Sequence, residues 1–111
     1  MKAVLLLFLL TLSLFAEVAG KWKIHSEGSN GMKTDAVLEL REDWGAWNGT
    51  IVVNEDKIQV NSVVVDGDKV SFDVGGDGVT YTVKAEVKGD RFEGTFTATD
   101  GVKGTVKGQR Q

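Results

Sequence analysis

The stretch from Asp66 to Phe96, DGDKVSFDVGGDGVTYTVKAEVKGDRFEGTF, decides the fold of this chain of 111 residues. Apolar and polar residues alternate through it with period two, and a turn built from Gly and Asp interrupts the alternation three times. The residues that share the apolar face are Val70, Phe72, Val74, Val79, Tyr81, Val83, Ala85, Val87, Phe92, Gly94 and Phe96. This pattern is typical of half-buried antiparallel strands joined by tight hairpins.

The same alternation continues on both sides of this stretch. Because every connection is short, consecutive strands should pair as neighbours. The sequence therefore predicts an all-β fold, an eight-stranded antiparallel up-and-down meander that is closed or nearly closed into a small barrel. The expected strands lie near residues 21–27, 33–41, 47–53, 58–65, 70–74, 79–87, 91–99 and 102–107.

One strand changes its facing partway along. Ile58 and Val60 are apolar at even positions, whereas Val63 and Val65 are apolar at odd positions. An extra residue at Asn61-Ser62, forming a β-bulge, would reset the facing and bend the strand. The barrel interior is then expected to contain Trp22, Leu38, Leu40, Trp47, Ile51, Phe72, Tyr81, Phe92 and Phe96.

A short motif, Φ-x-G-T-Φ with Φ an apolar residue, occurs at Trp47–Ile51, Phe92–Phe96 and Val102–Val106. In each copy an inward glycine stands between two inward apolar residues. Such a glycine lets a strand bend at a barrel corner or lets an aromatic ring lie over the backbone. The alternative is that these glycines line a ligand cavity, because eight-stranded barrels either fill their interior or hold one small ligand.

The N-terminus has the organisation of a signal peptide. Lys2 precedes the apolar run Ala3–Ala16, which is shorter than the ~20 residues of a membrane span but matches a signal-peptide h-region. Val18-Ala19-Gly20 favours cleavage before Lys21, and cleavage after Ala16 is the second choice. The alternative is an uncleaved anchor. We expect a signal peptide at residues 1–20, a single domain at residues 21–111 and a secreted or periplasmic protein.

Composition limits the possible partners. A net charge of −3 gives no electrostatic reason to expect nucleic acid or an anionic membrane surface as a partner. The chain has no cysteine, which excludes disulfides, thiolate metal sites and a lipid anchor on cysteine. A domain of this size must therefore rely on one continuous hydrophobic core. We expect no cofactor, and no membrane span after signal cleavage.

Several motifs resemble known barrel families. Gly20-Lys21-Trp22 resembles the G-x-W opening of the lipocalin, fatty-acid-binding and avidin superfamily, in which the tryptophan closes one barrel end. Together with the segments Leu38–Ile51, Val65–Phe72 and Val87–Thr95, it is similar to small exported bacterial lipocalin-like (calycin-type) β-barrel domains. These domains are generally without an assigned activity, so the resemblance implies a barrel rather than a ligand.

The resemblance to avidin and to fatty-acid-binding proteins is weaker. Avidins place ligand-stacking tryptophans in the second half of the chain, and here no tryptophan follows Trp47. Fatty-acid-binding proteins carry an Arg-x-Tyr pair near the C-terminus, whereas this chain ends Gln109-Arg110-Gln111. The sequence therefore predicts neither biotin binding nor that mode of fatty-acid binding.

Catalytic groups are scarce. His25 is the only histidine, and it lies on the polar face of the first strand, with no serine in a nucleophile-elbow context. Carboxylate pairs such as Glu42/Asp43 fall in hairpin turns, where aspartate is favoured for its local backbone hydrogen bonds, and none matches a calcium-loop motif. We expect no enzymatic activity and no metal site.

The remaining interpretation is a non-catalytic binding module for a small ligand, or for a protein or glycan, at one barrel end. The alternative is a structural or accessory envelope protein that acts through protein–protein contacts. The candidate binding residues are Trp22, Trp44, Trp47 and Tyr81. Trp44 lies in a turn between Glu42-Asp43 and Gly45, so it would either pack back over the barrel as a lid or remain free to contact a partner.

Overall fold

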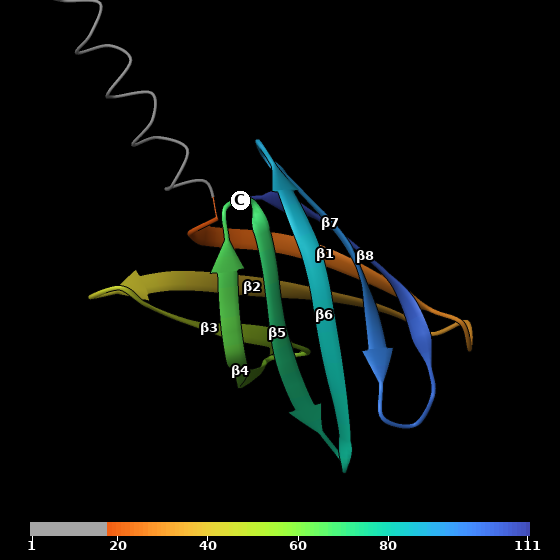
Figure 1. The fold of residues 1–111 in the computed structure, drawn as a ribbon. Coiled ribbons are helices and arrows are strands. Elements are labelled where there is room, and N and C mark those ends of the chain that lie inside the picture. Colours follow the sequence, from red (N-terminus) through yellow and green to blue (C-terminus); the bar gives the residue numbers. More distant parts are fainter. Residues whose placement is uncertain (1–17) are drawn as a thin grey trace, which may run out of the picture.

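The chain forms a closed antiparallel β-barrel (Figure 1). The computed structural model describes residues 18–111; the apolar run Ala3–Ala16 lies outside the described residues. Each strand pairs with its sequence neighbours, and the first strand also pairs with the last, which closes the sheet. The strands are β1 (Gly20–Gly28), β2 (Lys33–Asp43), β3 (Ala46–Val53), β4 (Asp56–Asp66), β5 (Lys69–Gly76), β6 (Val79–Lys88), β7 (Arg91–Ala98) and β8 (Lys103–Arg110).

This architecture confirms the predicted eight-stranded meander, and it also confirms the bulge. The β4–β5 register is continuous from Asp66 to Val64 and then shifts before Asn61. Ser62, within the shift, has a φ of 55°. Left-handed backbone of this kind is uncommon for a residue with a side chain, and it marks the extra residue that turns the strand.

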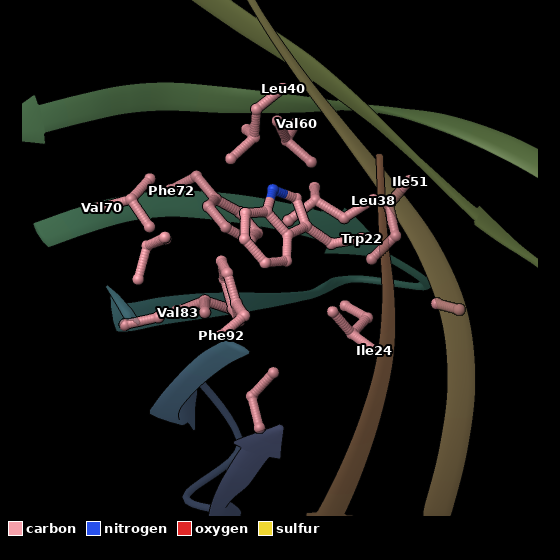
Figure 2. Packing of buried hydrophobic residues seen from close by; sticks show 14 of the residues in the cluster. Trp22, Ile24, Leu38, Leu40, Ile51, Val60, Val70, Phe72, Val83 and Phe92 are labelled. Carbon is pink, nitrogen blue, oxygen red and sulfur yellow. The ribbon is translucent and has the colours of Figure 1, made fainter. Parts of the chain in front are cut away.

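The largest fully buried side chain is Trp22, near one end of the barrel. Figure 2 shows its indole ring surrounded by Leu40, Val60, Phe72 and Phe92. The Trp22 and Phe92 rings lie 5.7 Å apart between centroids, and both side chains are fully buried. Of the nine residues predicted inside, only Trp47 and Tyr81 are incompletely buried, and Trp47 still packs against the core.

Residues just before β1 cover this end, which is called the closed end below. The side chain of Val18 is only 1% exposed, and its carbonyl oxygen accepts a hydrogen bond from Trp22 Nε1 at 3.1 Å. The guanidinium of Arg110 stacks 4.2 Å above the Trp22 ring centroid and donates from Nη1 to the Ala19 carbonyl oxygen at 2.9 Å. Buried indole N–H groups need such a partner, so the segment before β1 is part of the barrel's structure.

The glycines of the repeated motif lie where the backbone is crowded. A Cβ on Gly94 would collide with the backbone of Lys84 and Ala85 on β6. A Cβ on Gly104 would collide with the ring of Phe96, which lies over it. The motif therefore serves strand packing, in agreement with the first of its two interpretations, because neither of these glycines lines the cavity described next.

Candidate functional site: a cavity at the open end of the barrel

The barrel is hollow at the end opposite Trp22. A cavity of about 360 Å³ opens there, between the turns that join β1 to β2, β3 to β4, β5 to β6 and β7 to β8. Its floor is formed by core side chains and its walls by half-buried aliphatic ones. The main apolar lining residues are Ile24, Ile51, Ile58, Phe72, Val74 and Phe96.

A few polar side chains join this apolar lining. Ser26 and Asn30 are already engaged, because Ser26 Oγ is 3.5 Å from the Thr34 carbonyl oxygen and Asn30 Oδ1 accepts from the Met32 amide at 3.1 Å. The Asp100 carboxylate accepts from the Val102 amide at 3.1 Å with one oxygen. An apolar cavity with a few polar groups at its mouth is the usual form of a small-molecule site.

Tyr81 is the aromatic residue at the mouth. Its ring packs edge-on against Phe96, with centroids 6.0 Å apart, and 38% of the residue remains exposed. Within residues 18–111 its hydroxyl makes no hydrogen bond. Tyr81 therefore offers a ligand both an aromatic face and a hydrogen-bonding group.

Hydrogen bonds fix one side of the mouth. The Ser29 amide donates to the Lys103 carbonyl oxygen at 2.6 Å, and the Lys103 amide donates to Ser29 Oγ at 3.3 Å. Thr99 and Thr80 are joined in the same way: the Thr99 amide donates to the Thr80 carbonyl oxygen, and the Thr80 amide donates to Thr99 Oγ1. The turn that carries Asp100 is thus anchored on both sides, which holds its carboxylate in a defined place.

The four residues proposed from the sequence are not brought together. Tyr81 lines the cavity, whereas Trp22 is buried at the closed end and Trp47 packs half-buried against the core without lining the cavity. Trp44, at the tip of the β2–β3 turn, is fully exposed at 104% of its reference area. The packed-lid alternative for Trp44 is therefore wrong, and its side chain faces solvent.

Sequence reasoning missed two residues at the mouth. Met32, in the β1–β2 turn, is 66% exposed although it lines the cavity, and Asp100, in the β7–β8 turn, lines it as well. The available signal was their position: both occupy turns at the same barrel end as the inward residues Val74 and Tyr81. Recognising them required knowing which end of the barrel is hollow.

His25 lies outside the cavity on the outer barrel surface. Its Nδ1 is 2.7 Å from Asp35 Oδ1 and its Nε2 is 3.1 Å from Glu27 Oε1. The hydrogen bond to Asp35, and to a smaller extent the one to Glu27, raises the pKa of His25. The same hydrogen bond to His25 lowers the pKa of Glu27. No group of three or more potential metal ligands occurs among residues 18–111. Likewise, the described part contains no helix long and apolar enough to cross a membrane.

Comparisons with known proteins give a fold but no family. No protein-family model matches the chain, and no curated protein sequence matches it. Among solved structures, the redesigned β-barrel b11L5F_LGL is similar with a TM-score of 0.71 and 15% identity, over 88% of this chain and 95% of that one.

Two further designed barrels are similar. A fluorescence-activating β-barrel designed de novo gives a TM-score of 0.62 at 18% identity, over 86% of this chain and 97% of that one. The redesigned barrel mFAP0, whose structure contains bound DFHBI, gives 0.63 at 14% identity, over 83% and 97%. At these identities the likeness concerns the small eight-stranded barrel itself.

Proposed function

We propose that this protein is a non-catalytic binding module that takes a small, largely apolar ligand into the open end of its barrel. The observation that carries the proposal is the apolar cavity of about 360 Å³ opposite the closed end. Ligand sites are typically ~300–1,000 Å³ and lined by apolar side chains with a few placed polar groups. The resemblance to a designed barrel that holds DFHBI adds support from the fold, although fold alone does not assign function.

In this proposal the closed end of the barrel stabilises the fold and the open end binds the ligand. Trp22, Phe92 and the covering Val18 fill the closed end, so this end supplies the continuous core that a small domain needs. The open end can then remain hollow at a tolerable cost to stability. Met32 fits this division, because an exposed thioether beside an apolar cavity can adapt to a bound ligand.

The proposal includes export. The short apolar run Ala3–Ala16 after Lys2 supports a cleaved signal peptide and a secreted or periplasmic location. In such a location the protein would meet ligands that have left or not yet entered the cell.

Titration with N-phenyl-1-naphthylamine, a neutral apolar dye that brightens in apolar surroundings, tests the function. We expect saturable brightening and a raised melting temperature, since a ligand at about 100 times its Kd adds about 2.7 kcal/mol to the free energy of unfolding. The variant Val74→Phe, which fills part of the cavity, should abolish the brightening.

Val64→Phe is the matched control, because Val64 is exposed on the outer face of β4 and the variant adds the same volume outside the barrel. It should bind the dye like the unmodified protein. Absence of any saturable signal, or an equal loss in both variants, would contradict the proposal.

A second candidate function is contact with a macromolecule through Trp44. A fully exposed indole between Glu42 and Gly45, at the closed end of the barrel, gives up hydrophobic burial unless a partner covers it. This observation favours the accessory-protein alternative. Replacing Trp44 by Ala should leave the free energy of unfolding within about 0.5 kcal/mol, as for other exposed residues, and should weaken only the association with a partner.

A further inference from the structure

The charge of the cavity lining constrains the ligand. Among the residues that line the cavity, Asp100 is the single charged side chain, and no lysine, arginine or histidine is included. A bound carboxylate or phosphate would therefore meet one negative charge and no positive one. We infer, on the basis of the proposed function, that the ligand is an apolar molecule carrying a protonated amine, and that Asp100 determines this preference.

The lysines at this barrel end do not change the charge that the ligand meets. Lys33, Lys57 and Lys103 are exposed, and each is adjacent in sequence to a residue that lines the cavity. Successive side chains of a strand point to opposite faces, so these ammonium groups point outward into solvent. Solvent and salt screen them from a ligand inside the barrel.

Tyr81 gives the cation a second partner beside Asp100. The β6–β7 register pairs Tyr81 with Ala98, two residues before Asp100, and the Thr80–Thr99 hydrogen bonds hold the Asp100 turn against the start of β6. The aromatic ring and the carboxylate are thus presented from neighbouring strand ends at one side of the mouth. An ammonium group is attracted both by the face of a tyrosine ring and by a carboxylate, whereas a carboxylate ligand is attracted by neither.

Asp100 is also held in place for this role. One carboxylate oxygen accepts the Val102 amide, and the Gly101 amide donates to the Ala98 carbonyl oxygen in the same turn. A fixed carboxylate loses little freedom on binding, so more of its attraction for a cation is retained. Asn at this position would keep the hydrogen bond to the Val102 amide through its side-chain oxygen and remove only the charge.

Three ligands that share one ring system test the inference: 1-naphthylmethylamine, 1-naphthalenemethanol and 1-naphthoate, each used to displace N-phenyl-1-naphthylamine from the full barrel. We expect the amine to bind more tightly than the alcohol, and the alcohol more tightly than the carboxylate. Asp100→Asn should lower the affinity for the amine roughly two- to fivefold, the scale of one solvent-exposed ion pair, and leave the alcohol unchanged.

Asp77→Asn is the matched control. Asp77 lies in the β5–β6 turn at the same barrel end, does not line the cavity, and has a φ of 51° that asparagine tolerates. It removes the same charge from the protein and should leave the amine-to-alcohol ratio unchanged. An equal fall in both variants would show that net charge alone attracts the amine, which overturns the role of Asp100.

The other outcomes separate this inference from the proposed function. Displacement by the alcohol with no advantage for the amine, or binding of the carboxylate as tightly as the amine, would overturn the charge preference and leave the binding function intact. Failure of the dye and of all three ligands to bind would remove both.

Discussion

At the scale of single residues, glycine fixes how closely the strands approach. Gly94 and Gly75 both lie in strands, yet their surroundings are opposite. A Cβ on Gly94 would lie 2.6 Å from Ala85 Cα, whereas a Cβ on Gly75 would meet no atom within 4 Å. Neither glycine has a positive φ, so the comparison isolates steric space from backbone strain.

The expected result is that Gly94→Ala lowers the free energy of unfolding by about 1–3 kcal/mol, because backbone atoms of β6 cannot move aside. Gly75→Ala should change it by less than about 0.5 kcal/mol. Urea denaturation of the two variants provides the measurement. If both variants lost the same free energy of unfolding, the close approach of β6 to Gly94 would be contradicted.

At the same scale, the hydrogen bonds of His25 predict how stability depends on pH. Its hydrogen bonds to Asp35 and Glu27 raise its pKa above 6.5. The contribution of protonated His25 to the free energy of unfolding is therefore fully present below pH 6.5. It is lost as the pH rises through the higher pKa of the folded state. For Glu27, whose pKa is lowered from 4.5, the contribution is present above pH 4.5 and is lost on acidification through the lower folded pKa.

Because His25 is the only histidine, its imidazole proton resonances can be followed without assignment ambiguity. We expect an NMR titration midpoint above 6.5, and a midpoint closer to 6.5 in Asp35→Asn, since Asp35 is the larger cause of the shift. A midpoint at or below 6.5 in the unmodified protein would contradict this geometry.

At the scale of elements, the segment before β1 decides how the closed end is sealed. The predicted cleavage before Lys21 would remove Val18 and Ala19, which contact Trp22 and Arg110. Cleavage after Ala16, the second choice from the sequence, would keep both. The burial of Val18 is retained only by the second of these two cleavages, so the predicted signal peptide would fit this structure better if it ended at Ala16. Intact-mass analysis after expression of the full chain would show whether a bond is cleaved, and which one.

A chain starting at Lys21 should be less stable than one starting at Glu17. The loss combines the exposure of one valine-sized pocket with an unsatisfied Trp22 N–H, together about 2–4 kcal/mol. Chemical denaturation of the two recombinant chains measures it. Equal stabilities would show that residues before β1 are dispensable and would restore the cleavage before Lys21.

At the scale of the whole molecule, the barrel has a packed half and a hollow half. Val87 is buried in the packed half and does not line the cavity. Val87→Ala should lower the free energy of unfolding by roughly 2 kcal/mol, from two lost methyl groups and the space they leave. Its affinity for N-phenyl-1-naphthylamine should be unchanged in fluorescence titration, and a parallel fall in affinity would show that the halves are coupled.

The sequence predicted more of the fold than of the site for a physical reason. The strands and the bulge could be predicted because their signals lie in adjacent residues of the sequence. These signals are the alternation of apolar and polar residues at Val79–Val87 and the change from even to odd apolar positions at Asn61-Ser62. Which end is hollow depends on strand tilt and on Val18 covering Trp22, and neither follows from alternation. Tyr81 faces inward as predicted, but its exposure results from its place at the start of β6.

Closure through β1 and β8 also sets the order in which the molecule can assemble. Every other ladder joins neighbours in sequence, whereas this one joins β1 to β8, the first and last strands of the chain (Figure 1). It pairs Trp22 with Arg110 and Gly28 with Gly104. Pairings between distant parts of a chain form slowly, and until this one forms β1 and β8 are open edges able to pair with other molecules. The Ser29–Lys103 bonds at the mouth span the same seam. The proposed ligand would contact lining residues of both strands, such as Ile24 on β1 and Val106 on β8. It would then bind only the closed barrel and lower the fraction of molecules whose strand edges are open to aggregation.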